Sequence, residues 1–484
     1  MPSLLQRCCQ AACCISQQHL TALLCFLSIV NQYTMRVCLN LAITEMVLPK
    51  VINVTSNGTF VRLSPCGVDM DGSVLGVRGS STDFQRYAWD EATQGLILSA
   101  FFWGYVVSHF ASAFIADKYP RVLLGLSVLI TAVLTLLTPL AIDIGGAPLL
   151  MATRAIEGVG EGATFPVLSA IIGHWIPPGQ RGMLGSFIYS GGQIGSLIGG
   201  IGTGLIISKL GSWRLVFYVW GTLAIVWYLF WLVLGYASPE TNPFISEEEK
   251  NRLLGQFAEA RKVQRSSGIP WSKICKSVPL WALIIGQIGH DWGFYLLATD
   301  LPKYMKSILG VSVQDNAMIS FLPFLCMWIF SVLSGWICDV QIRRKCITTS
   351  NARKLWTTIG SLPPAIFIVA ASYANCNKLL VVIYFALSVT FMGGFYPGLK
   401  VNSNDLSPNL VGVLMAMVNG VGAITGVVVP YLAGVLTPNQ TVSEWRDVFW
   451  LTFWVLNVTN VVFVLFGSGE IQPWNSSDEE ASNT

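Results

Sequence analysis

Charged residues are scarce in this chain. Asp, Glu, Lys and Arg make up 11% of its 484 residues, whereas soluble domains carry roughly 25%. A water-soluble enzyme of this length cannot cover its surface with so few charges. Hydrophobic residues make up 53% even without glycine, and this apolar content also excludes a disordered chain. The composition indicates a polytopic α-helical membrane protein.

Other absences narrow the function. The sequence has no phosphate-binding P-loop, so it gives no support for ATP-driven pumping. It has only 4 histidines, which argues against a multi-histidine metalloenzyme, and we expect no metal or other cofactor. No nucleophile–base constellation favours a membrane enzyme. The net charge of +3 is too small to indicate a nucleic-acid partner, and 12 cysteines are too few for a disulfide scaffold.

The apolar residues fall into twelve stretches of membrane-spanning length, each near the roughly 20 residues that a transmembrane helix needs. A charged linker separates the sixth from the seventh. This pattern predicts an all-α membrane protein with twelve transmembrane helices in two pseudo-symmetric six-helix bundles, which we expect to be a monomer. The stretches are approximately residues 19–48, 93–116, 122–142, 148–175, 183–207, 213–236, 279–302, 317–338, 355–374, 379–401, 411–436 and 446–467.

Loop charges predict the orientation. Lys and Arg gather in the loops after spans two, four and eight and in the central linker, so this side is expected to be cytoplasmic. The glycosylation sequons at Asn53, Asn57 and Asn439 fall on the opposite side and agree with that. The predicted segments are a cytoplasmic N-terminal segment (1–18), the first bundle (19–236) with its outer loop (49–91), a cytoplasmic linker (237–278), the second bundle (279–467) and a cytoplasmic tail (468–484).

The loops after spans two and eight share one element. An aspartate, Asp117 or Asp339, follows a small residue by four positions and precedes a basic cluster. We interpret both aspartates as gate residues that link these loops to neighbouring helix ends on the cytoplasmic side.

Cysteines suggest two modifications. Cys66 and Cys376 both fall on the predicted outer side, where an oxidised pair is an option. Four cysteines beside the first span are candidates for palmitoylation, although unmodified small apolar residues are the alternative. These four are Cys8, Cys9, Cys13 and Cys14.

Ionisable residues inside spans are costly and are therefore the candidates for function. In span one, Tyr33, Arg36, Asn40 and Thr44 are spaced to share one helical stripe. Arg36 is mid-span, and its guanidinium can hold a carboxylate or phosphate with two parallel hydrogen bonds. The alternative is a structural ion pair with a neighbouring helix.

Span four carries Arg154, Glu157 and Glu161, whose offsets of three and seven place them on one face. A buried carboxylate near an arginine can alternate between an ion pair and a protonated acid, which is what a proton-coupled carrier needs. The alternative is a static Arg–Glu bridge.

Span seven carries His290 and Asp291 about halfway across. His290 is a candidate for binding or for titration, or it is a neutral core residue. Asp300 and Lys303 fall near the outer end of the same span and are expected to be solvated. Glycines and Pro397 interrupt span ten, and broken helices expose backbone groups to a cavity.

At these residues the sequence resembles a known family, the solute carrier 17 anion transporters of the major facilitator superfamily. The family includes sialin, sodium–phosphate cotransporters, vesicular glutamate transporters and insect inorganic phosphate cotransporters. The matching segments cover nearly the whole chain in order. They are RVCLNLAITEMV (36–47), GLILSAFFWGY (95–105), RAIEGVGEGATFP (154–166), WIPPGQRG (175–182), FYVWG (217–221), WGFYLLATDLPKYM (292–305), LVGVLMAMVNGVG (410–422), EWRDVF (444–449) and FGSGEIQPW (466–474).

The resemblance implies a carrier that works by alternating access. It implies anion binding at Arg36 and a functional pair of Arg154 and Glu161, with Glu157 as the second acid of the sialin type. The chain departs from the family in four places, one of which is Ser112-Ala113 where the family usually has a glycine pair. Ser169 replaces a histidine of sialin-like members, and Leu98 and His290 replace a histidine and an arginine of the glutamate carriers, which argues against glutamate transport.

The leading hypothesis is a symporter that moves an organic anion or inorganic phosphate with protons or sodium. Tyr33, Arg36, Asn40, Arg154 and His290 are predicted to bind the substrate, and Glu157 and Glu161 to couple the ion. Two alternatives remain: an uncoupled facilitator or exchanger, and an anion-sensing receptor on a transporter fold. The plasma membrane is the favoured location, with a lysosomal or vesicular membrane as the alternative.

Overall fold

The structure is a computed structural model that describes residues 16–48, 86–113, 115–116, 118–177, 180–261, 269–374, 376–407 and 410–475. Several residues singled out in the sequence lie outside these ranges, so the roles assigned to them stay predictions. They are Cys8, Cys9, Cys13, Cys14, Asn53, Asn57, Cys66 and Asp117.

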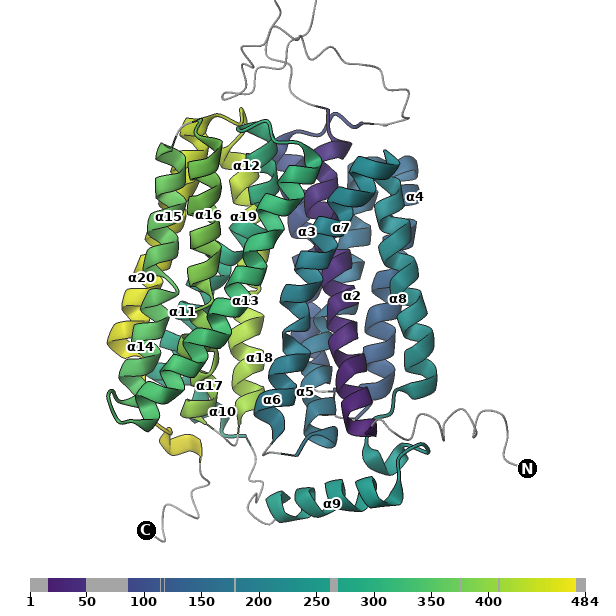
Figure 1. Ribbon diagram of the computed structural model, residues 1–484, viewed down its shortest axis with the longest axis vertical. Coiled ribbons are helices and arrows are strands. Elements are labelled where there is room, and N and C mark those ends of the chain that lie inside the picture. Colours follow the sequence, from purple (N-terminus) through teal and green to yellow (C-terminus); the bar gives the residue numbers. More distant parts are fainter. Residues whose placement is uncertain are drawn as a thin grey trace, which may run out of the picture.

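The described helices form two bundles that stand side by side (Figure 1). Each bundle has its own apolar core, as expected for two six-helix halves. The first bundle contains α2 (Gln17–Met46), α3 (Glu91–Ala113), α4 (Pro120–Gly162), α5 (Thr164–Trp175), α6 (Arg181–Tyr189), α7 (Gly191–Leu210) and α8 (Arg214–Leu234). The second contains α11 (Val278–Tyr295), η4 (Leu296–Asp300), α12 (Leu301–Ser307), α13 (Val313–Arg343), α14 (Thr349–Ile359), α15 (Leu362–Tyr373), α16 (Lys378–Met392), η5 (Tyr396–Lys400), α17 (Asn402–Leu406), α18 (Val411–Gly422), α19 (Ile424–Leu436) and α20 (Val442–Phe466).

Ten helical stretches of the described chain are long and apolar enough to cross a membrane. One of them, Pro120–Trp175, has 56 residues and is interrupted at Gly146, whose φ of 58° breaks the helical path. A side chain at that φ would be strained, so glycine allows the chain to turn back there. The run Val278–Ser307 adds a further helical path through α11, η4 and α12. These two features account for the difference between ten and the twelve predicted crossings.

Two of the membrane-spanning stretches depart from regular α-helical geometry. η4 and η5 are π-helical turns of five residues each, one in span seven and one in span ten. Such turns are rare and often mark functional sites, because they displace side chains from the regular helical stripe. The two π-turns therefore suggest that a functional site lies between the bundles.

The two bundles touch through close backbone contacts. α3 packs on α19, where a Cβ added at Gly95 would collide with the Pro430 carbonyl oxygen and one added at Gly434 would collide with that of Glu91. Only glycine permits this approach. Val37 and Leu41 of α2 belong to the core of the second bundle, so α2 also crosses the boundary between the bundles.

Ion pairs join the bundles at their predicted outer end. Lys306 of α12 pairs with Glu45 of α2 at 2.5 Å, and Lys303 pairs with Glu91 of α3 at 3.1 Å. The expectation that Asp300 and Lys303 are solvated is therefore wrong, since they are 0% and 5% exposed. The helical path continues to Ser307, and the first bundle covers this part of it.

The central linker contains α9 (Glu247–Arg261), which lies across the opposite end of the bundles from α12 (Figure 1). Its Glu249 carboxylate accepts hydrogen bonds from the Ser16 hydroxyl and from the backbone N–H groups of Gln17 (3.1 Å) and Gln18 (3.2 Å). The α9 helix thus caps the first turn of α2. This contact fixes the linker helix to the first bundle.

Candidate functional site

A cavity of about 1330 Å³ lies between the bundles and is lined by residues of both. It runs from Arg36 of α2 to Ile269 and Trp271, which belong to the linker and are 40% and 47% exposed. The cavity therefore reaches the predicted cytoplasmic end of the protein. The ion pairs of α12 lie at the other end.

Arg36 lies at the deep end of this cavity, opposite Ile269 and Trp271. Its Nη2 donates to Glu161 Oε1 at 2.5 Å, and the two residues are 8% and 1% exposed. Four aromatic rings surround the guanidinium, with Tyr33 at 4.5 Å and Phe101 at 4.7 Å as the nearest. Ring faces stabilise a cation that has lost its water. Arg36 thus combines a buried ion pair with contact to the cavity.

Glu161 keeps one carboxylate oxygen, Oε2, without a hydrogen-bond partner among the described residues, and Arg36 Nε is in the same state. Buried polar atoms without partners are uncommon and call for an explanation. Arg36 lines the cavity, which can admit water or an ion, and Glu161 is bonded to Arg36 without lining the cavity itself. The Arg36–Glu161 pair can therefore form further hydrogen bonds through these two atoms.

Arg154 and Glu157 form a second buried pair in α4, one turn apart. Arg154 Nη1 donates to Glu157 Oε2 at 2.6 Å, and the Thr135 hydroxyl donates to Oε1 at 3.1 Å. Both Glu157 oxygens are therefore bonded. Neither residue is among those that line the cavity, but Arg154 Nη2 donates to the Arg36 carbonyl oxygen at 3.4 Å. The pair lies behind Arg36.

The other predicted residues of span one divide between two places. Tyr33 lines the cavity and packs under the Arg36 guanidinium. Asn40 is not among the cavity-lining residues, and its side-chain amide donates to the Ala298 carbonyl oxygen at 3.0 Å. Because Ala298 belongs to the π-turn η4, Asn40 ties α2 to the second bundle.

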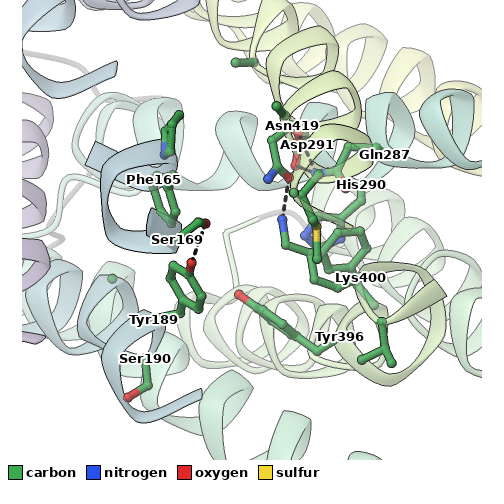
Figure 2. Close-up of a pocket in the computed structure, with 18 of the residues that line it drawn as sticks. Phe165, Ser169, Tyr189, Ser190, Gln287, His290, Asp291, Tyr396, Lys400 and Asn419 are labelled. Carbon is green, nitrogen blue, oxygen red and sulfur yellow. Dashed lines mark hydrogen bonds between the residues drawn. The ribbon is translucent and has the colours of Figure 1, made fainter. Parts of the chain in front are cut away.

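The second bundle contributes a polar cluster on the other side of the cavity (Figure 2). His290 stacks on Phe395 with ring centroids 3.5 Å apart. The side-chain amide of Gln287 donates to both oxygens of Asp291, each at 2.9 Å. The predicted candidate His290 therefore lies at the cavity wall, together with Asp291.

Lys400 is a site residue that the sequence pattern did not reveal. It ends the π-turn η5, lines the cavity, and its Nζ donates to Asn419 Oδ1 at 2.5 Å. It is close enough to His290 and Asp291 to act on both electrostatically. The sequence feature that could have revealed Lys400 is a lysine in the part of span ten that glycines and Pro397 interrupt. Hydropathy alone places this lysine at the end of the span.

Ser169 and Tyr189 face this cluster from the first bundle (Figure 2). Their hydroxyl oxygens lie 2.9 Å apart, and both residues line the cavity. Nearby, the Gln193 side-chain amide donates to the Tyr396 hydroxyl at 2.5 Å, which joins α7 to η5 across the cavity. Hydroxyl groups thus occupy the wall where sialin-like members carry a histidine.

The remaining candidates lie at the periphery. Asp339 is exposed and lines the cavity, on the side predicted to be cytoplasmic. Asn439 is exposed in the turn before α20. Cys376 is disulfide-bonded, in agreement with the oxidised state considered for it. A further histidine, His109, is buried instead: it is 2% exposed, its Nδ1 lies 3.1 Å from the Gly162 carbonyl oxygen, and it lines the cavity.

Known proteins resemble this chain over nearly its whole length. Residues 25–430 and 283–483 match the Major Facilitator Superfamily. Sialin of Homo sapiens is 36% identical over 471 residues, which are 97% of this chain and 92% of sialin. The chain belongs to the solute carrier 17 family of the Major Facilitator Superfamily. It is a multi-pass membrane transporter and not an enzyme, as the sequence predicted.

Other relatives are similar over most of the chain. A Drosophila melanogaster protein named "Putative inorganic phosphate cotransporter" is 33% identical, over 96% of this chain and 88% of that protein. Vesicular glutamate transporter 1 of Bos taurus is 32% identical, over 83% and 72%. The partially occluded, inward-open xylose transporter XylE from E. coli shares the fold, with a TM-score of 0.66, 13% identity and coverage of 93% and 99%.

Proposed function

We propose that this transporter moves an organic anion or inorganic phosphate together with a proton or a sodium ion by alternating access. Its relatives sialin, "inorganic phosphate cotransporter" and vesicular glutamate transporter support an anionic substrate. The two bundles around one cavity support alternating access, because each bundle can rock against the other about a central site.

The Arg36–Glu161 pair carries this proposal. A cation at a cavity wall can bind a substrate anion, and a carboxylate bonded to the same cation can take up a proton when the substrate displaces it. Substrate and proton then occupy the site together, which is symport. Because the substrate anion and the Glu161 carboxylate compete for Arg36, substrate binding and protonation of Glu161 are coupled directly.

We assign the other residues according to their positions. Tyr33 and His290 line the cavity and are proposed to contact the substrate. Arg154 and Glu157, which are paired with each other and do not line the cavity, are proposed to position Arg36 from behind. Asn40 is proposed to hold the bundles together on the outer side, and Asp339 to act as a cytoplasmic gate.

An uncoupled anion exchanger is the second candidate. The observation in its favour is that both buried glutamates of α4 already have arginine partners. A permanent ion pair would make Glu161 structural. Uptake would then respond to substrate on the far side but not to an imposed proton or sodium gradient.

The test is uptake by purified protein in proteoliposomes. Labelled sialate, phosphate and glutamate are offered separately, each under an imposed proton gradient, an imposed sodium gradient or neither. We expect one of these anions to accumulate above its equilibrium level under one gradient. Gradient-independent exchange would favour the second candidate, and no uptake of any anion would contradict both. We propose the plasma membrane as its location, which surface labelling of tagged protein in cells can test.

A further inference from the structure

We propose that Lys400 is a second anion-binding group, which holds a negatively charged group of the substrate from the C-terminal bundle. This inference rests on the proposed anion transport and adds the residue that makes first contact with an anion in the cavity.

The cations that line the cavity differ in their charge partners. Among the residues that the structure describes, three Lys or Arg side chains line it: Arg36, Arg353 and Lys400. Arg36 is paired with Glu161 at 2.5 Å and Arg353 with Asp405 at 2.6 Å. Among the described residues, Lys400 has no carboxylate within the 4.0 Å that defines an ion pair. It is therefore the lining cation whose charge remains available.

The neighbours of Lys400 keep it oriented without neutralising it. Its ammonium donates to the neutral Asn419 side chain, leaving two of its three donors for other acceptors. Asp291 lies nearby, but its carboxylate is held by both hydrogen bonds from Gln287. The cluster therefore leaves a positively charged group beside a bound carboxylate. A substrate anion is the acceptor that would complete it.

The backbone places Lys400 where a substrate can reach it. In an uninterrupted helix a residue near the end of span ten would extend its ammonium toward the membrane surface. The π-turn η5 and the following α17 carry the helical stretch on to Leu406. Lys400 thus lies within the span and lines the cavity, in reach of Asn419 on α18.

Arg36 is less accessible by comparison. It is 8% exposed, carries an acidic partner and is wrapped by the rings of Tyr33, Phe101 and Tyr105. The anion that enters from the cytoplasmic side meets Lys400 without displacing any carboxylate. A cavity of about 1330 Å³ also leaves room for a body much larger than the anionic group. The hydroxyls of Ser169 and Tyr189 face that space.

The first experiment measures uptake kinetics in proteoliposomes for the anion that the wild type takes up from the panel of sialate, phosphate and glutamate. For Lys400→Gln we expect KM to rise about 10-fold or more, equivalent to about 1.4 kcal/mol, with a smaller change in kcat. Lys400→Arg should recover most of the affinity because it restores the charge. Lys378→Gln is the matched control, since this exposed lysine begins the same helical stretch at its outer end.

A second measurement uses wild-type protein, so it does not depend on a variant that folds. Amine acylation is followed residue by residue by mass spectrometry, with and without the saturating anion. We expect the anion to slow labelling of Lys400 and to leave Lys378 unchanged. A wild-type KM for the Lys400→Gln variant, or equal labelling of Lys400 with and without the anion, overturns this inference alone. A wild type that takes up none of the three anions overturns the proposed function itself.

Discussion

Arg36 and Glu161, which are 125 positions apart in the sequence, form a buried ion pair with a 2.5 Å distance between Nη2 and Oε1. The pair joins α2 to α4 within the first bundle. Removing one partner of such a pair leaves an uncompensated charge in a poorly solvated place, which is strongly unfavourable. Any step that separates the two must therefore supply a new partner, either a substrate anion for Arg36 or a proton for Glu161.

Glu161→Gln should abolish uptake driven by a proton gradient while permitting some exchange of anion for anion. The amide cannot take up a proton, but it can still accept one hydrogen bond from Arg36. The measurement compares gradient-driven uptake with counterflow in the same proteoliposomes. We expect the driven rate to fall about 100-fold, because the coupling group is lost, and counterflow to fall about 10-fold at most.

Glu157→Gln is the matched control for this variant, since it removes the other buried acid of the same helix. It should lower stability and activity together without separating driven uptake from counterflow. If Glu161→Gln retains wild-type gradient-driven uptake, Glu161 does not couple the ion, and the exchanger becomes the better description.

Much of the architecture could be predicted from the sequence. Long apolar stretches, loop charges and the motifs of a known family indicated the membrane class, the two halves and the transporter class, because these depend on local composition. The pairing of Arg154 with Glu157 was also accessible, since residues three apart share a helical face. The pairing of Arg36 with Glu161 could not be predicted, because it depends on how α2 packs against α4.

The positions of Lys303 and Lys400 illustrate what local patterns cannot supply. Both fall near the end of an apolar stretch, and a lysine there is normally solvated. In the structure the helical path continues beyond each of them, to Ser307 and Leu406. Each lysine then meets groups from distant segments, Glu91 or Asn419. Hydropathy gives the length of a span only approximately. It does not show which residues of other segments contact the side chains of that span.

Asn439 should carry a glycan in a eukaryotic expression host. The residue is exposed in the turn before α20, and its side-chain amide donates to Glu444 Oε1 at 2.9 Å. An amide has two N–H groups, so one can be replaced by a sugar while the other keeps this bond. Asn439→Gln should reduce the mobility shift produced by an endoglycosidase. A fourth sequon, Asn475-Ser-Ser477, lies in the tail that is predicted to be cytoplasmic. Asn475→Gln should therefore leave the mobility shift unchanged, and the reverse pattern would mean that the predicted orientation is inverted.

Glu249→Ala should release the linker helix α9 from the first bundle. The variant loses the acceptors for the N–H groups of Gln17 and Gln18, and loss of a helix N-cap costs about 1 kcal/mol. Limited proteolysis of the linker should therefore be about 5-fold faster. Glu248→Ala, an exposed neighbour on the same helix, is the control and should be cleaved at the wild-type rate. Equal cleavage of both variants would mean that Glu249 does not hold α9.

Reversing the charge of Glu45 should loosen the outer closure between the bundles. Glu45 Oε1 lies 2.5 Å from Lys306 Nζ, and both side chains are largely buried. Glu45→Lys places two ammonium groups there, and even a solvent-exposed ion pair contributes up to about 1 kcal/mol. Hydrogen exchange at the outer ends of α2 and α12 should become about 5-fold faster. The double variant Glu45→Lys with Lys306→Glu restores opposite charges and should return exchange toward the wild-type rate. If the double variant exchanges as fast as Glu45→Lys alone, the effect comes from packing rather than from charge, and the ion pair does not close the outer side.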